Sequence, residues 1–209
     1  MKKMIVPDFG KMSAAELDNL RQIVHSLSFV DRDLKALVIC SCDRKTDAAG
    51  LTGRMARVMA AEGKRVLILR ALLQDPSAVS EEMGLTHYLA GLCGMEDILH
   101  ETDAAGVSLI PAGACSANPE MLMSGDELQH LIDACKARFD WLLIEAAPLT
   151  RQDASALHAA ACSDGAIFAV KDHATVSRQL KTARKAVEQT GCPIIGCIVL
   201  DAKRPKAYA

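Results

Sequence analysis

The feature that most constrains the fold is a set of six short apolar runs that recur along the chain. Each run is continuous rather than alternating with polar residues, which is the pattern of strands buried on both faces of a parallel sheet. The runs occupy residues 36–40, 65–70, 106–111, 141–147, 165–170 and 193–200. They predict one sheet that is covered by helices on both sides.

Helical patterns fill the intervals between these runs. Apolar residues recur at helical spacing within 51–59, 128–135 and 176–187. Because strand and helix alternate, we predict an α/β fold with a doubly wound, mostly parallel sheet and right-handed crossovers. Such a chain is expected to form a single domain over residues 1–209.

Both ends of the chain extend beyond this alternation. An amphipathic helix is predicted within an N-terminal extension, residues 1–33, and it must cover either the sheet or a neighbouring subunit. Its apolar stripe consists of Leu17, Leu20, Ile23, Val24 and Leu27. The basic segment 202–209 is expected to be a flexible tail.

Composition excludes several classes of function. A net charge of -2 gives no general attraction to nucleic acid or to anionic lipid. The apolar runs are far shorter than the roughly 20 residues of a membrane helix, and Pro7 and Asp8 interrupt any signal-peptide core. We therefore expect a cytoplasmic chain. The eight cysteines lack the spacing of a zinc or redox site, which predicts packing residues and no metal centre.

Four segments carry a family resemblance: GLTHYLAG from Gly84, IPAG from Ile110, NPEMLMS from Asn118 and DGAIFAVKDHATVSRQL from Asp164. Together with the order of the strands, they resemble the cytoplasmic tyrosine kinase domain of bacterial capsule and exopolysaccharide synthesis. These kinases are a branch of the P-loop ATPases that includes the ParA and MinD proteins. The resemblance extends over nearly the whole chain and implies the P-loop NTPase fold.

The chain departs from this resemblance where the kinases bind nucleotide and metal. Alignment on EGKRVLIL places the family's phosphate-loop lysine at Ala48 and the following hydroxyl residue at Ala49. The two aspartates after the second strand fall at Arg70 and Leu72, and the acidic residue of the IIDTPP strand becomes Glu145. The resemblance therefore implies degenerate motifs with no intact catalytic residue.

The physical consequence is a loss of affinity for phosphate. A phosphate loop needs glycines so that consecutive backbone amides converge on the anion. Here Asp47 directs a negative charge towards that position, and two like charges about 4 Å apart repel by roughly 4 kcal/mol at an effective dielectric near 20. Arg44 and Lys45 only balance Asp43 and Asp47. We expect no cofactor.

Arg70 and Glu145 suggest what replaces the metal. Both should lie at the carboxyl ends of strands that face the family's magnesium position. We predict that the guanidinium of Arg70 takes this position and is neutralised by Glu145, with Asp47 or Asp43 as a second partner. An unpaired, buried Glu145 would cost several kcal/mol. The alternative is that Arg70 points into solvent at the end of its strand.

Several other residues match the family only in part. Asp201 corresponds to the base-contacting Asn and could still accept a hydrogen bond from an adenine amino group. Asp18 and Arg21 match part of an E-x-x-R-x-x-R signature for self-association, but Val24 replaces the last Arg. The kinases carry a tyrosine-rich tail that is phosphorylated between subunits, of which Tyr208 alone remains as a candidate phosphoacceptor.

Three hypotheses follow. The first is a non-catalytic component of capsule or exopolysaccharide synthesis. It would bind the cytoplasmic tail of a transmembrane chain-length regulator or an active kinase paralogue, which could recruit it to the inner face of the membrane. The second is a divergent tyrosine kinase or ATPase that uses ATP and magnesium, with Lys45 in place of the missing lysine. The third is a sensor that holds another anion on Arg44 and Lys45. Ala48, Ala49 and Arg70 favour the first.

Overall fold

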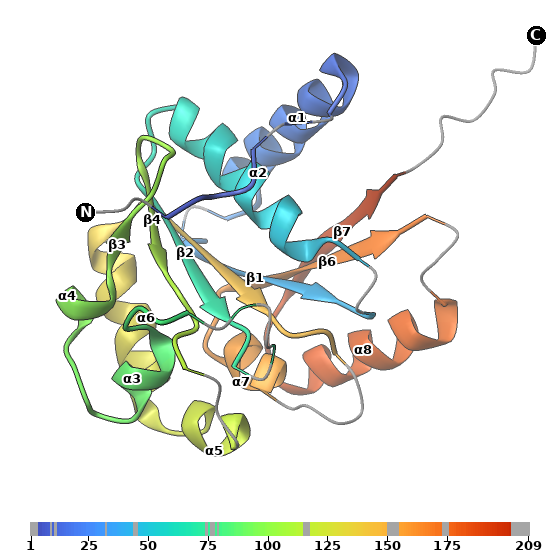
Figure 1. Ribbon diagram of the computed structural model, residues 1–209. Coiled ribbons are helices and arrows are strands. Elements are labelled where there is room, and N and C mark those ends of the chain that lie inside the picture. Colours follow the sequence, from blue (N-terminus) through green and yellow to red (C-terminus); the bar gives the residue numbers. More distant parts are fainter. Residues whose placement is uncertain are drawn as a thin grey trace, which may run out of the picture.

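The structure is a computed structural model that describes residues 4–8, 10, 12–31, 33–43, 46–73, 75, 78, 80–114, 118–149, 155–172 and 176–201. A seven-stranded sheet forms its centre (Figure 1). The strands are β1 (Ala36–Ser41), β2 (Val66–Ala71), β3 (His100–Glu101), β4 (Val107–Ile110), β5 (Trp141–Ala146), β6 (Gly165–Lys171) and β7 (Ile194–Leu200). The helices are α1 (Ala14–Val30), α2 (Ala48–Ala61), α3 (Leu85–Leu89), α4 (Met95–Ile98), α5 (Pro119–Met123), α6 (Asp126–Arg138), α7 (Ser155–Ala161) and α8 (Ser177–Gln189).

The sheet has the order β3-β4-β2-β5-β1-β6-β7. Its pairs are parallel except for β3 and β4, which are antiparallel. The six strands predicted from the apolar runs are all present. The short edge strand β3 was not predicted, because two residues are too few to form a pattern. The prediction of a doubly wound, mostly parallel sheet is confirmed.

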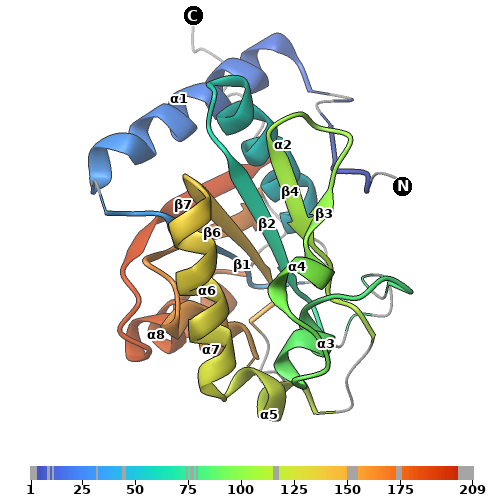
Figure 2. The ribbon, with the colours of Figure 1, turned by 90° about the vertical axis from the view of Figure 1, so that its left-hand side faces the viewer.

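Two layers of helices enclose the sheet, with α1 and α2 on one face and α6, α7 and α8 on the other (Figures 1 and 2). The predicted N-terminal helix is α1, and it packs against α2 over the sheet. Its buried residues are Leu20, Val24 and Leu27. Among the described residues, no helix combines the length and the apolar character needed to cross a bilayer.

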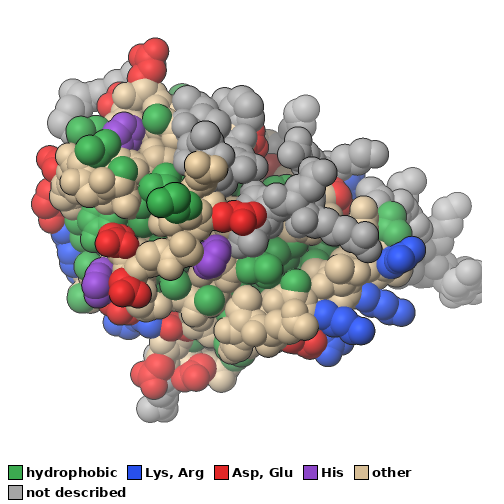
Figure 3. Space-filling model, turned by 90° about the horizontal axis from the view of Figure 1, so that it is seen from below, with side chains coloured by type: hydrophobic (Ala, Val, Ile, Leu, Met, Phe, Trp, Pro, Cys, Tyr) green, Lys and Arg blue, Asp and Glu red, His purple; other side chains and the backbone are tan. Residues whose placement is uncertain are grey.

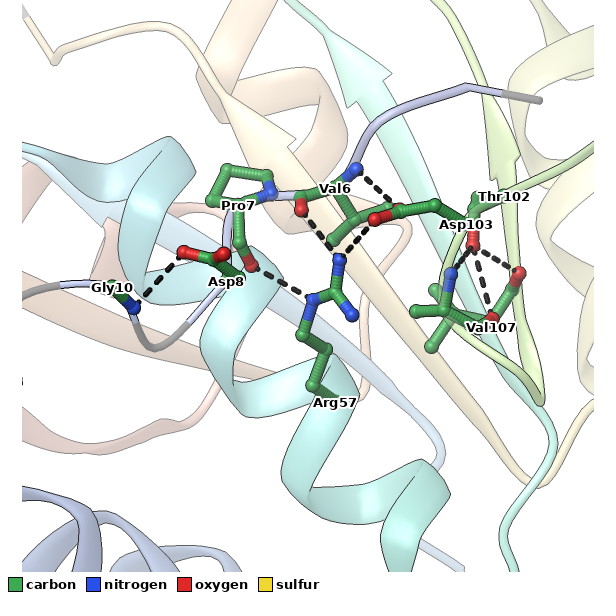
Figure 4. A network of polar contacts seen from close by, with 9 residues as sticks. Val6, Pro7, Asp8, Gly10, Arg57, Thr102, Asp103 and Val107 are labelled. Carbon is green, nitrogen blue, oxygen red and sulfur yellow. Dashed lines mark hydrogen bonds and ion pairs between the residues drawn. The ribbon is translucent and has the colours of Figure 1, made fainter. Parts of the chain in front are cut away.

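Residues 4–8 run as an extended segment between α2 and the start of the β3–β4 turn (Figure 4). The amide of Val6 donates to Asp103 Oδ1 at 2.9 Å. Arg57 Nη2, on α2, donates to the carbonyl of Val6 at 2.8 Å and to Asp103 Oδ2 at 2.6 Å. Arg57 Nε also donates to the carbonyl of Pro7 at 3.2 Å. One guanidinium therefore joins three separate parts of the chain.

Candidate functional site

The candidate site lies where β1 ends and α2 begins, which is the phosphate-loop position of the resemblance. Ala48 is the first residue of α2 and is buried, and Ala49 is half-buried. Methyl groups thus occupy the two positions at which the resemblance leads one to expect a lysine and a hydroxyl. Arg44 and Lys45 lie outside the described residues.

Asp47 is the N-cap of α2. Its Oδ1 accepts the amide proton of Gly50 at 2.8 Å, which satisfies one of the free amides of the first helical turn. A Cβ atom added to Gly50 would lie 1.9 Å from Asp47 Oδ2, so any other residue at position 50 would force the carboxylate to move. Because a helix N-terminus attracts negative charge, the carboxylate of Asp47 is stabilised at this position.

Two other described residues of this loop, Asp43 and Thr46, are also bonded to each other. Asp43 Oδ1 accepts from both the amide and the hydroxyl of Thr46, at 3.0 and 3.1 Å. Arg54 Nη2 lies 3.6 Å from Asp47 Oδ2, so Arg54 is the ion-pair partner of Asp47 among the described residues. Sequence reasoning had offered Asp47 as a second partner for Arg70. It missed the capping signal, an Asp placed three residues before Gly50 at the start of a helix.

The structure brings Arg70 and Glu145 together. They are direct neighbours in the register of β2 and β5, and Arg70 Nε lies 3.4 Å from Glu145 Oε2. The Glu145 side chain is 4% exposed and that of Arg70 is 25% exposed. Arg70 and Glu145 lie two residues beyond Ile68 and Leu143, which pack under α1 and α2. Residues two apart on a strand point to the same face, so both side chains face the α2 side of the sheet. Arg70 does not extend freely into solvent.

Burial dominates the chemistry of this pair. It raises the pKa of Glu145, and the nearby Arg70 guanidinium offsets the rise only in part. A carboxylate in this state needs its cation to remain ionised. Leu72, the other position of the family's aspartates, follows β2 and is half-buried. Its side chain carries no oxygen that could bind a metal.

A cavity of about 360 Å³ opens beside α1 and α2, at the carboxyl ends of β6 and β7. Asp47 and Arg54 line it from α2, and Lys171 and Asp201 line it from the sheet. Lys171 Nζ lies 3.1 Å from Asp201 Oδ2. Asp201 has a left-handed backbone, with φ 56°, which Asp tolerates better than most residues. The candidate base contact is thus paired with a lysine.

The residues proposed for self-association lie on α1. Arg21 Nη1 and Asp18 Oδ1 are 3.2 Å apart, and both side chains are exposed. Val24 is buried between α1 and the sheet, so position 24 faces the interior rather than a second subunit. Tyr208 lies outside the described residues.

The described cysteines act mainly in packing. Four of these seven are buried: Cys40, Cys42, Cys135 and Cys192. Burial raises the pKa of the Cys40 thiol to about 12, which keeps it protonated and unreactive at neutral pH. Within the described ranges, His, Cys, Asp and Glu side chains do not gather in a group that could hold a metal ion.

Comparison with known proteins gives bacterial tyrosine kinases as homologues, although no protein-family model matches the chain. The tyrosine-protein kinase CpsD of Streptococcus agalactiae is 25% identical over 180 residues, which cover 83% of this chain and 78% of that protein. The tyrosine-protein kinase ptk of Acinetobacter johnsonii is 27% identical over 219 residues, which cover 98% of this chain and 28% of that protein.

Solved structures agree on the fold. The kinase domain of the Escherichia coli tyrosine kinase ETK superposes with a TM-score of 0.82 at 20% identity, covering 93% of this chain and 80% of that one. The septum site-determining protein MinD of Pyrococcus horikoshii, complexed with Mg-ADP, gives a TM-score of 0.67 at 19% identity, covering 79% of this chain and 70% of that one. The predicted P-loop NTPase fold and the resemblance to tyrosine kinases are confirmed.

Proposed function

We propose that this homologue of bacterial tyrosine kinases is a pseudokinase of capsule or exopolysaccharide synthesis, which acts by binding another protein rather than by transferring phosphate. The main support is the carboxylate of Asp47, bonded to the amide of Gly50 at the N-terminus of α2. A phosphate at this point would have to displace that carboxylate or lie against it. At about 4 Å the repulsion is roughly 4 kcal/mol, or about three orders of magnitude in affinity.

The residues present do not fit Mg-ATP at this site. Phosphoryl transfer depends on positioning and on neutralising charge with a metal ion and cationic side chains. Ala48 and Ala49 supply neither the charge nor the metal ligand. Arg70 adds a fixed cation, 3.4 Å from the one acidic side chain retained from the family pattern, Glu145. A divalent cation would compete with that guanidinium for the same carboxylate.

The proposal predicts that ATP and magnesium leave the melting temperature unchanged. A ligand at a hundred times its dissociation constant would add about 2.7 kcal/mol to the free energy of unfolding, which a thermal shift assay detects easily. The kinase domain of ETK, treated in parallel, is the positive control. A magnesium-dependent rise in melting temperature, or labelled phosphate on tyrosine in the purified protein, would refute the proposal.

The expected partner is an active kinase paralogue or the cytoplasmic tail of a transmembrane chain-length regulator. Such a partner would place a cytoplasmic chain at the inner face of the membrane. Self-association through Asp18 and Arg21 would compete with it. Light scattering of the protein alone and mixed with each partner separates the cases: a mixed complex supports the proposal, whereas homo-oligomers alone contradict it.

A further inference from the structure

We infer that the cavity between α1, α2 and β7 is a binding site for a basic segment of polypeptide, and that its occupant is residues 202–206 of the same chain. The segment would then lie against the molecule instead of remaining the flexible tail expected from the sequence. The inference goes beyond the proposed function, because it depends on the lining of this cavity and not on whether the protein transfers phosphate.

The first observation is an apolar strip that α1 leaves incompletely covered. The cavity has a volume of about 360 Å³, and its lining includes Met12, Ile23, Ile198 and Leu200, all of them half-buried. Ile198 and Leu200 lie on the face of β7 that packs with α1 and α2. A side chain with an apolar stem and a charged head, as in lysine and arginine, can lay its stem along such a strip and keep its head at the rim.

The second observation is an excess of acidic groups around this strip. The charged side chains that line the cavity carry a net charge of -2: Asp8, Glu16, Asp47 and Asp201 against Arg54 and Lys171. Each of the two cations already has a carboxylate beside it, because Arg54 Nη2 lies 3.6 Å from Asp47 Oδ2 and Lys171 Nζ lies 3.1 Å from Asp201 Oδ2. Asp8 and Glu16 supply the excess, which a basic group can neutralise.

The third observation is the point at which the basic segment leaves the sheet. Asp201 lines the cavity and is the last described residue. Its left-handed backbone, with φ 56°, ends the extended conformation of β7, so the chain changes direction at the rim of the cavity. Lys203, Arg204 and Lys206 follow within five residues, and such lengths of chain span at most about 7 to 18 Å. All three side chains can therefore reach the rim without any movement of β7.

Covalent attachment favours this occupant over a second copy of the chain. A short linker holds its segment at an effective concentration on the order of millimolar. A segment from a second copy, or a free basic peptide, does not reach this concentration in a micromolar solution. A modest intrinsic affinity is therefore enough to fill the cavity from within the same chain.

The opposite face of the sheet repels the segment. There α8 packs against β7, and its exposed residues carry a net charge of +3: Arg178, Lys181, Arg184 and Lys185 against Glu188. Figure 3 shows Lys and Arg side chains gathered on the side of the molecule where α8 lies. Like charges thus direct a basic segment away from α8 and towards the acidic cavity on the α1 side.

Nuclear magnetic resonance relaxation of the ¹⁵N-labelled full chain tests the inference. The backbone order parameters of Lys203, Arg204 and Lys206 should exceed about 0.6, the value below which a chain counts as flexible. They should fall below it in about 1 M salt, where the screening length is only about 3 Å. Values below about 0.6 at low salt would overturn the inference. A fall on dilution would also overturn it, because the occupant would then be a second copy.

A matched pair of double variants tests the place of binding. Asp8→Asn with Glu16→Gln removes both excess charges but keeps the oxygens that accept the amides of Gly10 and Ser13. It should release the segment. The control, Asp18→Asn with Glu62→Gln, removes the same charge from exposed residues outside the cavity and should leave the order parameters unchanged. Equal order parameters in the two double variants would overturn the inference.

Carbodiimide cross-linking, which joins a lysine to a neighbouring carboxylate, provides a second measurement on the unchanged chain. We expect Lys203 or Lys206 to be joined to Asp8 or Glu16 within one molecule. Links from these lysines only to carboxylates outside the cavity would overturn the inference.

Addition of ATP and magnesium distinguishes this inference from the proposed function. Order parameters that stay unchanged support both. Release of the segment by ATP and magnesium would support the cavity as its binding site and contradict the proposed function. A segment that is flexible without nucleotide would overturn the inference alone.

Discussion

Arg70 Nε and Glu145 Oε2 lie 3.4 Å apart on adjacent strands, and Glu145 is almost completely buried. The resemblance to tyrosine kinases implies that this pair stands in place of acidic residues. Its energy depends on both members, because a buried carboxylate without a cation is costly.

Removing the cation should therefore cost more at neutral pH than in acid. Arg70→Ala is expected to lower the free energy of unfolding by about 3 kcal/mol at pH 7.5. Burial already raises the pKa of Glu145, so the folded state binds a proton more readily than the unfolded state. The Glu145 carboxyl therefore contributes stability that is fully present below its pKa in the unfolded state. This contribution is lost as the pH rises through its pKa in the folded state. The loss of unfolding free energy caused by Arg70→Ala should thus become smaller as the pH falls towards 4.5.

Urea unfolding between pH 4.5 and 7.5 measures this effect. The double variant Arg70→Ala with Glu145→Gln is the control, since it removes both charges and should recover much of the loss. A penalty for Arg70→Ala that stays constant over this pH range would show that the guanidinium acts through packing alone.

The N-cap of α2 predicts that the effect of Gly50→Ala on stability depends on the residue at position 47. Gly50→Ala should destabilise the protein by about 1 kcal/mol, because its Cβ would displace the Asp47 carboxylate. In an Asp47→Ala background the same change should be neutral or stabilising by up to about 1 kcal/mol, since alanine is the better helix former. Thermal unfolding of the wild type, of each single variant and of the double variant measures this dependence. Additive effects would mean that Asp47 does not hold this position in solution.

Arg57 should control the attachment of residues 4–8. Arg57→Ala removes the donors to the carbonyls of Val6 and Pro7 and to Asp103. We expect hydrogen exchange at the Val6 amide to accelerate by about tenfold or more, with little change in the amides of β1. Arg57→Lys should not restore protection fully, because one ammonium cannot reproduce the planar fork. Equal exchange in all three proteins would contradict this role.

The fold could be predicted from the sequence because its strongest signals are local. Continuous apolar runs identified six strands, since strands buried on both faces need no polar residues. The pair of Arg70 and Glu145 was expected from the family resemblance, which places both residues where the kinases' acidic residues converge. The contact between Arg57 and Asp103 could not be found in this way, because 46 residues separate them and neither belongs to a periodic pattern.

The direction of a side chain was harder to predict than its position. Asp47 was expected between the first strand and the following helix, where it lies, but it was expected to repel a ligand or to pair with Arg70. In the structure it caps its own helix and lies beside Arg54. A cap is visible in the sequence only when the first helical residue is known, and helix boundaries are the least certain part of any such prediction.

The register of β2 and β5 also limits how position 70 can change, since residue 70 lies directly opposite Glu145. An aspartate at position 70 would set two carboxylates against each other on neighbouring strands with no cation between them. Replacement of Arg70 by an acidic residue therefore passes through a less stable protein. If the chain descends from an active kinase, as the proposed function implies, this register makes one amino-acid change hard to reverse.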